Sequence, residues 1–192
     1  MNDVAEATDV IRRGDLVVYP TDTLYGLGAD VFNERAVERV YRIKRRPHGM
    51  PLPVAVGSVD DIESVAVMND TAWALARALL PGALTLVLSK RDTISEQVAG
   101  DTIAVRVPDH HVAMELCRHA GPISATSANL HGQMAPSTVG KAREQLGDAV
   151  DLYLDGGELP GVPSTVAAIT PEGVTVIREG AVSEERLHDI IH

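Results

Sequence analysis

Hydroxyl side chains and glycines crowd into one short stretch of the chain, Tyr19-Pro20-Thr21-Asp22-Thr23-Leu24-Tyr25-Gly26-Leu27-Gly28. Pro20 lacks a backbone donor, so the β-branched run before it, 16–19, is expected to end there as a strand. Hydroxyl groups beside a backbone that glycine leaves free to approach a ligand can bind a polar substrate. The same stretch is also consistent with an ordinary polar turn after a buried strand.

A group of cations follows at Lys44, Arg45 and Arg46. A helix over 34–45, with Asn33 as its N-cap, would carry Lys44 in the middle of its apolar face, where a lysine needs a polar partner. Pro47 disfavours helix at Arg46, so Lys44 and Arg46 would lie at the end of an element and could converge on an anion. Cations at a helix C-terminus also complement the helix macrodipole, which is enough to explain Arg45.

Arg106 lies in the run 103–107, which is otherwise apolar, within a segment, 102–107, that is expected to form a strand. A guanidinium group there requires a fixed partner, which is either a carboxylate of this chain or a bound carboxylate or phosphate. Arg178 ends another apolar run, 174–178, in the same way. Cations that converge without a nucleophile or a general base would align an anionic, phosphate-bearing substrate and catalyse by positioning and charge stabilisation.

Missing motifs exclude several other kinds of site. Gly26 and Gly28 lack the third glycine of the dinucleotide fingerprint, and no Gly-x-x-x-x-Gly-Lys-Ser/Thr loop occurs. Ser127-Ala128-Asn129 is not accompanied by the Ser-x-x-Lys and Lys-Thr-Gly of penicillin-binding enzymes. The histidines show no metal-ligand spacing, and the single cysteine, Cys117, excludes an internal disulfide.

The composition is typical of one soluble globular domain. The chain has 192 residues, of which 45% are hydrophobic, and its net charge of −10 argues against a broad electrostatic surface for nucleic acid. No apolar run is long enough to span a bilayer, and the first residues do not have the pattern of a secretory signal. We therefore expect a cytoplasmic protein without membrane association.

Short β-branched runs alternate with amphipathic segments along the chain. The pattern predicts strands at 16–19, 53–56, 84–88, 102–107, 122–125, 151–154, 165–169 and 174–178. It predicts helices at 4–13, 34–45, 60–67, 71–80, 111–119 and 139–146, and a last helix capped by Ser183. Some consecutive strands have no helix between them, so the sheet should be mixed, within a three-layer α/β sandwich. Polar loops follow several strand ends, where ligands bind in such sheets.

In their order along the chain, several of these segments resemble the YrdC/TsaC family of threonylcarbamoyl-AMP synthases. The matching segments are Pro20-Thr-Asp-Thr-Leu-Tyr-Gly-Leu-Gly28, Lys44-x-Arg46-Pro47, Pro81-Gly-Ala-Leu-Thr85, Val105-Arg-Val-Pro108, Thr126-Ser-Ala-Asn129, Pro163-Ser-Thr-Val166 and Arg178-x-Gly180. The resemblance covers nearly the whole chain. It implies a single YrdC-like domain over residues 1–192, with a twisted mixed β-sheet, flanking helices and a large cationic groove.

The resemblance also implies an activity. The chain would be a nucleotidyltransferase that condenses L-threonine, bicarbonate and ATP into threonylcarbamoyl-AMP and pyrophosphate, with Mg²⁺ carried by the ATP. The product would pass to the tRNA threonylcarbamoyl transferase machinery for the t6A37 modification of tRNA. Longer relatives carry a second C-terminal domain, so this sequence is expected to be the short, single-domain form.

The site residues that the resemblance implies fall into two groups. The L-threonine site would consist of Thr23, Arg106, Ala125 and Ser164, with Arg106 holding the carboxylate. The ATP site would consist of Lys44, Arg46, Thr102, Ser127, Asn129, Ala135 and Arg178, with Lys44 and Arg46 as the catalytic cations that neutralise phosphates. No direct protein ligand for the metal is expected. The chain departs from the family pattern at Met50, Ala55 and Ala135, where asparagine, histidine and serine are common.

Two other functions stay open. A YciO-like paralogue would keep the groove but act on another substrate. A double-stranded RNA-binding module, or weak binding of tRNA beside the synthase activity, would use the helix stripe Arg35, Arg39 and Arg42 for phosphate contacts. A solvated helix face with a Glu38–Arg42 pair explains the same stripe.

Overall fold

The computed structural model describes residues 2–171 and 173–191. Within these ranges the strands form a four-stranded sheet, in the order β7-β2-β1-β8, and a six-stranded sheet, in the order β10-β9-β4-β5-β3-β6. Each sheet contains parallel and antiparallel pairs, which confirms the prediction of a mixed α/β fold. The strands are, however, divided between two hydrogen-bonded sheets, whereas the sequence led us to expect one.

The small sheet consists of β1 (Val17–Tyr19), β2 (Gly26–Gly28), β7 (Thr126–Ser127) and β8 (Leu152–Tyr153). The strand β2 was not predicted, because Gly-Leu-Gly has no β-branched residue. Its two glycines allow the ring of Tyr19 to lie against it. A Cβ atom on Gly26 or on Gly28 would come within 2.9 or 3.0 Å of that ring, so a side chain at either position would displace it.

The large sheet consists of β3 (Val54–Ala55), β4 (Leu84–Ser89), β5 (Thr102–Arg106), β6 (Ile123–Ser124), β9 (Thr165–Thr170) and β10 (Gly173–Arg178). β9 and β10 are antiparallel neighbours, as their separation by a short turn predicted. The predicted turn, Pro171-Glu172-Gly173, includes residue 172, which lies outside the described residues. Ala125 joins β6 to β7 and so connects the two sheets.

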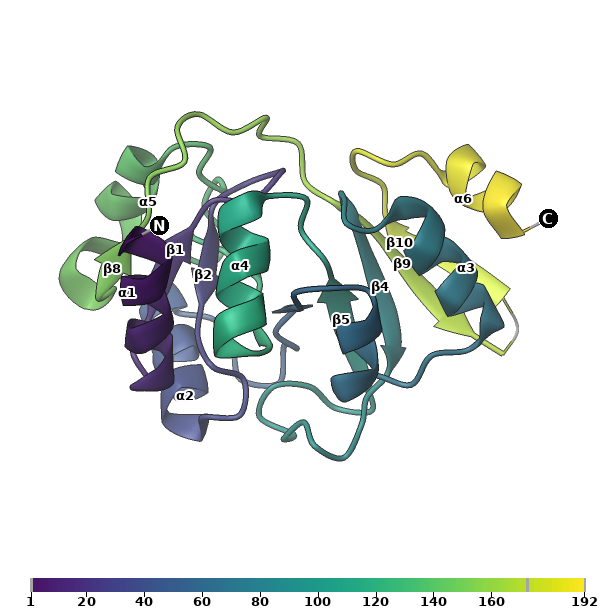
Figure 1. Ribbon diagram of the computed structural model, residues 1–192, viewed down its shortest axis with the longest axis horizontal. Helices are drawn as coiled ribbons and strands as arrows, with labels where there is room; N and C mark the ends of the chain where they lie inside the picture. The colour runs from purple at the N-terminus through teal and green to yellow at the C-terminus, as the bar shows by residue number, and fades with distance from the viewer. Residues whose placement is uncertain (1, 172, 192) are drawn as a thin grey trace.

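The helices are α1 (Asn2–Arg12), α2 (Glu34–Lys44), α3 (Asp70–Leu79), α4 (His111–Ala120), α5 (Val139–Leu146) and α6 (Glu184–Ile191). Figure 1 shows α1 and α4 side by side, and α3 beside α6 near β9 and β10. Two short 3₁₀ helices complete the set, η1 (Asp60–Ser64) and η2 (Gly147–Ala149). The first of these occupies part of the segment 60–67 for which a short helix was predicted.

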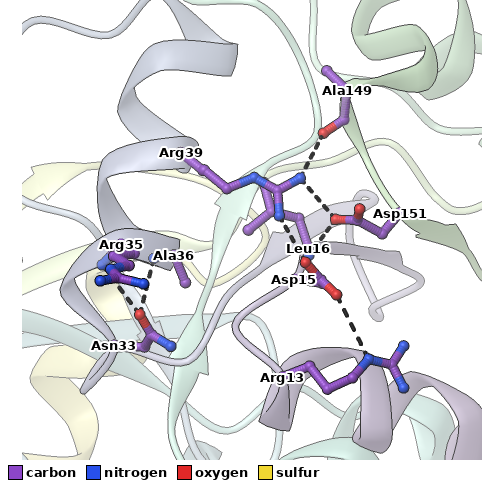
Figure 2. Close-up of polar contacts among 9 residues, drawn as sticks. All are labelled: Arg13, Asp15, Leu16, Asn33, Arg35, Ala36, Arg39, Ala149 and Asp151. Carbon is purple, nitrogen blue, oxygen red and sulfur yellow. Dashed lines mark hydrogen bonds and ion pairs between the residues drawn. The ribbon is translucent and has the colours of Figure 1, made fainter.

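The helix α2 is fixed at its start and along its exposed face. The Asn33 side chain accepts hydrogen bonds from the backbone N–H groups of Arg35 and Ala36, which confirms it as the N-cap (Figure 2). Arg39 forms ion pairs of 3.0 Å with Asp15 and 2.9 Å with Asp151. These pairs join α2 to the segments that lead into β1 and β8.

Candidate active site

A pocket of about 520 Å³ is lined by residues from both sheets. The small sheet contributes Tyr19, Gly26, Thr126 and Ser127, and the large sheet contributes Ala55, Thr85, Ala104, Arg106, Val166 and Arg178. Eight of the residues expected in the site line this pocket: Thr23, Arg46, Arg106, Ala125, Ser127, Ala135, Ser164 and Arg178. Lys44, Thr102 and Asn129 are not among its lining residues. The fold therefore brings most of the expected residues together, from segments far apart in the sequence.

Arg106, at the end of β5, is the buried cation of the pocket. Its guanidinium donates hydrogen bonds to Thr23 Oγ1 (3.0 Å), to Asp22 Oδ1 (2.7 Å) and to the carbonyl of Gly82 (3.0 Å). Its Nε atom is buried and has no hydrogen-bond partner. Burial lowers the pKa of Arg106, and the Asp22 carboxylate acts against that shift. The side chain is thus held in place by three hydrogen bonds, which use three of the five N–H donors of a guanidinium group.

Ser164 and Arg178 form an adjoining part of the pocket wall. The Ser164 and Thr85 hydroxyl groups are hydrogen-bonded at 2.9 Å, and Arg178 donates to the Ser164 carbonyl at 2.9 Å. Gly180 allows its own backbone to lie close to that of Pro163 and Ser164, because a Cβ atom at this position would lie 2.3 Å from the carbonyl oxygen of Pro163. Thr85 was not identified as a site residue from the sequence, although it lies in one of the segments that carried the family resemblance.

Arg46 lines the pocket just beyond the end of α2. Its guanidinium donates to the carbonyl groups of Met50 (3.3 Å) and Pro51 (2.9 Å). Burial lowers the pKa of Arg46. Arg46 and Arg178 are therefore two cations of the pocket wall that have no carboxylate partner among the described residues.

Lys44 lies behind the pocket wall, 2% exposed. Its ammonium donates to the backbone carbonyl groups of Ser127 (2.5 Å) and Asn129 (2.6 Å). Burial, together with the smaller effect of the nearby charge of Arg46, lowers the pKa of Lys44 to about 7. These two carbonyl groups are the polar partner that a lysine on an apolar helix face requires.

The residues around Ser127 form a turn with its own hydrogen bonds. The Ser127 hydroxyl donates to Asn129 Oδ1, and Asn129 Nδ2 donates to the carbonyl groups of Leu130 (2.8 Å) and Gln133 (2.9 Å). The side chain of Asn129 therefore stabilises the turn.

Thr102 lies away from this part of the site. It is an exposed residue at the far end of β5, four residues and about 13 Å along the strand from Arg106.

The segment 155–164, which we call the strap, runs from β8 to β9 beside the pocket without regular secondary structure. The Tyr25 hydroxyl donates to the carbonyl of Gly157 (2.8 Å) and accepts from the N–H of Gly156 (2.9 Å). The N–H of Gly161 donates to the carbonyl of Thr23 at 2.9 Å. Tyr25 was part of the stretch that drew attention in the sequence, but its role in holding the strap was not predicted.

The donors in this pocket suit an anionic ligand. Three arginines and several hydroxyl groups line it, and none of its lining residues is an Asp or a Glu.

In the part of the chain that the structure describes, no three His, Cys, Asp or Glu side chains are placed to hold a metal ion. None of the helices described is both long enough and apolar enough to cross a membrane.

Sequence comparison connects this geometry with known proteins. The family model Sua5_yciO_yrdC, described as telomere recombination, matches residues 9–180. A Mycobacterium tuberculosis protein, whose name threonylcarbamoyl-AMP synthase is marked as provisional, is 41% identical, covering 98% of this chain and 88% of its own. A Pyrococcus abyssi protein named threonylcarbamoyl-AMP synthase is 37% identical, covering 96% of this chain and 56% of its own.

Solved structures share the fold. The crystal structure of Pyrococcus abyssi Sua5 complexed with L-threonine superimposes with a TM-score of 0.94 at 36% identity, covering 98% of this chain and 57% of that chain. The crystal structure of Escherichia coli YciO superimposes with a TM-score of 0.87 at 28% identity, covering 96% of this chain and 92% of that chain. This chain therefore spans little more than half the length of the Pyrococcus proteins.

Proposed function

The chain belongs to the Sua5/YciO/YrdC family, and on this premise we propose that it is a threonylcarbamoyl-AMP synthase. Its substrates would be L-threonine, bicarbonate and ATP, and its products threonylcarbamoyl-AMP and pyrophosphate. The observation that carries this proposal is Arg106, a buried arginine with an unpaired Nε atom in a pocket that two further arginines line. Such a pocket combines an ordered anchor for one carboxylate with charge for a second, polyanionic substrate.

L-Threonine would bind at the end of the pocket that Arg106 forms. Its carboxylate would accept a hydrogen bond from the guanidinium of Arg106, whose orientation Asp22 and Thr23 already fix. Ser164, bound to Thr85, is the nearby hydroxyl for the polar groups of the amino acid, and Ala125 lines the same pocket. An arginine fixed before binding costs little ordering entropy when the substrate arrives.

ATP would bind along the side of the pocket that carries Arg46, Ser127, Ala135 and Arg178, with its Mg²⁺ arriving on the phosphates. The amino nitrogen of threonine first bonds to the bicarbonate carbon as water leaves, which gives a carbamate. A carbamate oxygen then bonds to the α-phosphorus as the bond from that phosphorus to pyrophosphate breaks. Arg46 and Arg178 would offset the charge that develops on the phosphate oxygens.

The setting of the reaction follows from its product. Threonylcarbamoyl-AMP is a reactive mixed anhydride, so an enzyme that transfers the threonylcarbamoyl group to tRNA must use it promptly. We propose that this protein works in the cytoplasm beside such a transferase. Direct binding of RNA has less support, because Arg39 of the Arg35, Arg39 and Arg42 stripe is already paired with Asp15 and Asp151.

The experiment that tests the proposal is pyrophosphate release from MgATP, with and without L-threonine and bicarbonate. Release that needs both co-substrates, and that falls at least about tenfold in Arg106→Met, is the expected result. Arg118→Met is the matched control, because Arg118 pairs with Glu115 on the surface of α4. Nucleotide binding without threonine-dependent release would contradict the proposal and favour a YciO-like activity on another acid.

A further inference from the structure

Lys44 is enclosed in a way that a phosphate ligand cannot easily share. Its side chain is 2% exposed, and its ammonium already donates to two carbonyl oxygens, of Ser127 at 2.5 Å and of Asn129 at 2.6 Å. An ammonium has three donors, so at most one remains. Lys44 is also absent from the residues that line the pocket, whereas Arg46, two positions later, is present.

The same turn holds Lys44 at its backbone. The carbonyl of Lys44 accepts a hydrogen bond of 2.7 Å from the N–H of His131. Residues 127–131 therefore contact Lys44 at both ends, through its ammonium and through its own carbonyl. The internal bonds from Ser127 to Asn129, and from Asn129 to Leu130 and Gln133, complete this turn.

Ser127 is the residue through which Lys44 can reach the pocket. Its carbonyl accepts a hydrogen bond from the Lys44 ammonium, and Ser127 is also one of the residues that line the pocket. The backbone N–H of Asn129 also donates to the Ser127 carbonyl at 2.9 Å, so the Lys44 side chain adds two hydrogen bonds to a turn that has one of its own.

We propose that Lys44 is a positioning residue for the nucleotide side of the site. Its ammonium holds the turn 127–131 so that Ser127 is presented to the nucleotide, and it does not itself contact a phosphate. The turn-holding part of this inference needs only the geometry described here. The part that concerns the nucleotide rests on the proposed function.

The first test is hydrogen–deuterium exchange of the nucleotide-free protein, with Lys44→Met compared with wild type. Amides of residues 127–133 should exchange about ten times faster or more in Lys44→Met, because the two hydrogen bonds from Lys44 Nζ are lost. Lys90→Met is the matched control, since Lys90 donates to the Ile94 carbonyl at 3.0 Å outside the pocket. It should leave exchange at 127–133 unchanged. Unchanged exchange in Lys44→Met would overturn the proposal whatever the protein's activity.

The second test is a double-mutant cycle on the dissociation constant of MgATP, with Lys44→Met, Ser127→Ala and the double variant. If Lys44 acts through the turn, Lys44→Met should weaken binding about tenfold in the wild type and about twofold or less in Ser127→Ala. Equal factors in both backgrounds would instead identify Lys44 as a direct phosphate ligand and overturn the proposal. Circular dichroism checks that the variants are folded. Lys44→Gln, which keeps two N–H donors on a shorter neutral side chain, replaces Lys44→Met if that variant does not fold.

The two tests separate this inference from the proposed function. A wild type that shows no threonine-dependent pyrophosphate release would contradict the synthase activity, yet the exchange experiment would still decide whether Lys44 holds the turn. Conversely, a fully active synthase with unchanged exchange in Lys44→Met would reject the role of Lys44 alone.

Discussion

Arg106 donates a 2.7 Å hydrogen bond to the Asp22 carboxylate, and the two side chains are only 8% and 15% exposed. The sequence left two explanations for an arginine in this strand, a carboxylate of the chain and a bound anion. The structure shows the carboxylate of the chain, Asp22. It also leaves a bound anion possible, since Arg106 lines the pocket and uses only three of its five N–H donors within the protein. The pocket is therefore charge-balanced at this end and still has a donor for a substrate.

Asp22→Asn should lower the free energy of unfolding by about 2 kcal/mol, because it leaves the charge of Arg106 buried without a counter-ion. The loss is smaller than for a fully enclosed pair, since the Asp22 side chain is 15% exposed. Urea denaturation measures it. Glu115→Gln is the control, because it breaks a 2.6 Å ion pair with Arg118 on the surface and should cost less than about 0.5 kcal/mol. Equal losses in the two variants would mean that burial does not matter here.

Arg106→Lys should raise the KM for threonine by roughly ten- to a hundredfold and change the KM for ATP by about twofold or less. A lysine keeps the positive charge, but its three N–H donors would all be used to replace the bonds to Asp22, Thr23 and the Gly82 carbonyl, which leaves none for the substrate. Steady-state pyrophosphate release measures both constants. Arg178→Lys should give the reverse pattern, with the larger change for ATP. Parallel changes of both constants in Arg106→Lys would show that the pocket has no separate amino-acid end.

The free energy of unfolding of the wild type should increase, relative to that of Lys44→Met, as the pH rises from 7 to 9. Lys44 has a pKa of about 7 in the folded protein and 10.5 as its ordinary value, so between these values the unfolded chain binds one more proton. Stability then increases with pH, by up to about 1.4 kcal/mol per pH unit. Urea denaturation at several pH values, with the two proteins side by side, gives this slope. A difference that stays constant or shrinks over the range would place the pKa of the buried lysine near its ordinary value.

Arg39→Met should lower the free energy of unfolding by about 1–2 kcal/mol and leave the KM values unchanged. It removes the ion pairs with Asp15 and Asp151 that join α2 to β1 and β8, at a site that is about one quarter exposed (Figure 2). Arg35→Met, on the same helix, is the control and should cost less than about 0.5 kcal/mol. If Arg39→Met were no worse than Arg35→Met, the network would contribute nothing measurable.

Local sequence patterns predicted the helices well, because each signal lies within the helix itself. The predicted bounds 139–146 are those of α5, and Asn33 caps α2 as expected. Arg45 falls outside α2 since it adopts a left-handed conformation, with φ of 51°. Strands that depend on distant partners were harder. β2 is Gly-Leu-Gly and β7 is two residues long, so neither carries a pattern of its own.

The site was predicted in part, for a similar reason. Lys44 and Arg106 drew attention because a cation on an apolar face is costly without a partner. The partners themselves could not be predicted, since the carbonyl groups of Ser127 and Asn129 lie more than eighty residues from Lys44 and Asp22 lies as far from Arg106. Thr102 stays a prediction, since it lies at the other end of β5 from Arg106 and outside the residues that line the pocket.

The strap is a place where the chain could be cut into two fragments that each carry part of the pocket. It is exposed along most of its length apart from Leu159 and Ser164, and a protease that cut it would separate Thr23, Arg46 and Arg106 from Ser164 and Arg178. The C-terminal fragment would keep β9, which pairs with β4 through Leu84–Val87, and α6, which packs on α3. Two separately made fragments should then reassemble through that strand pairing, and the pocket would exist only in the reassembled pair.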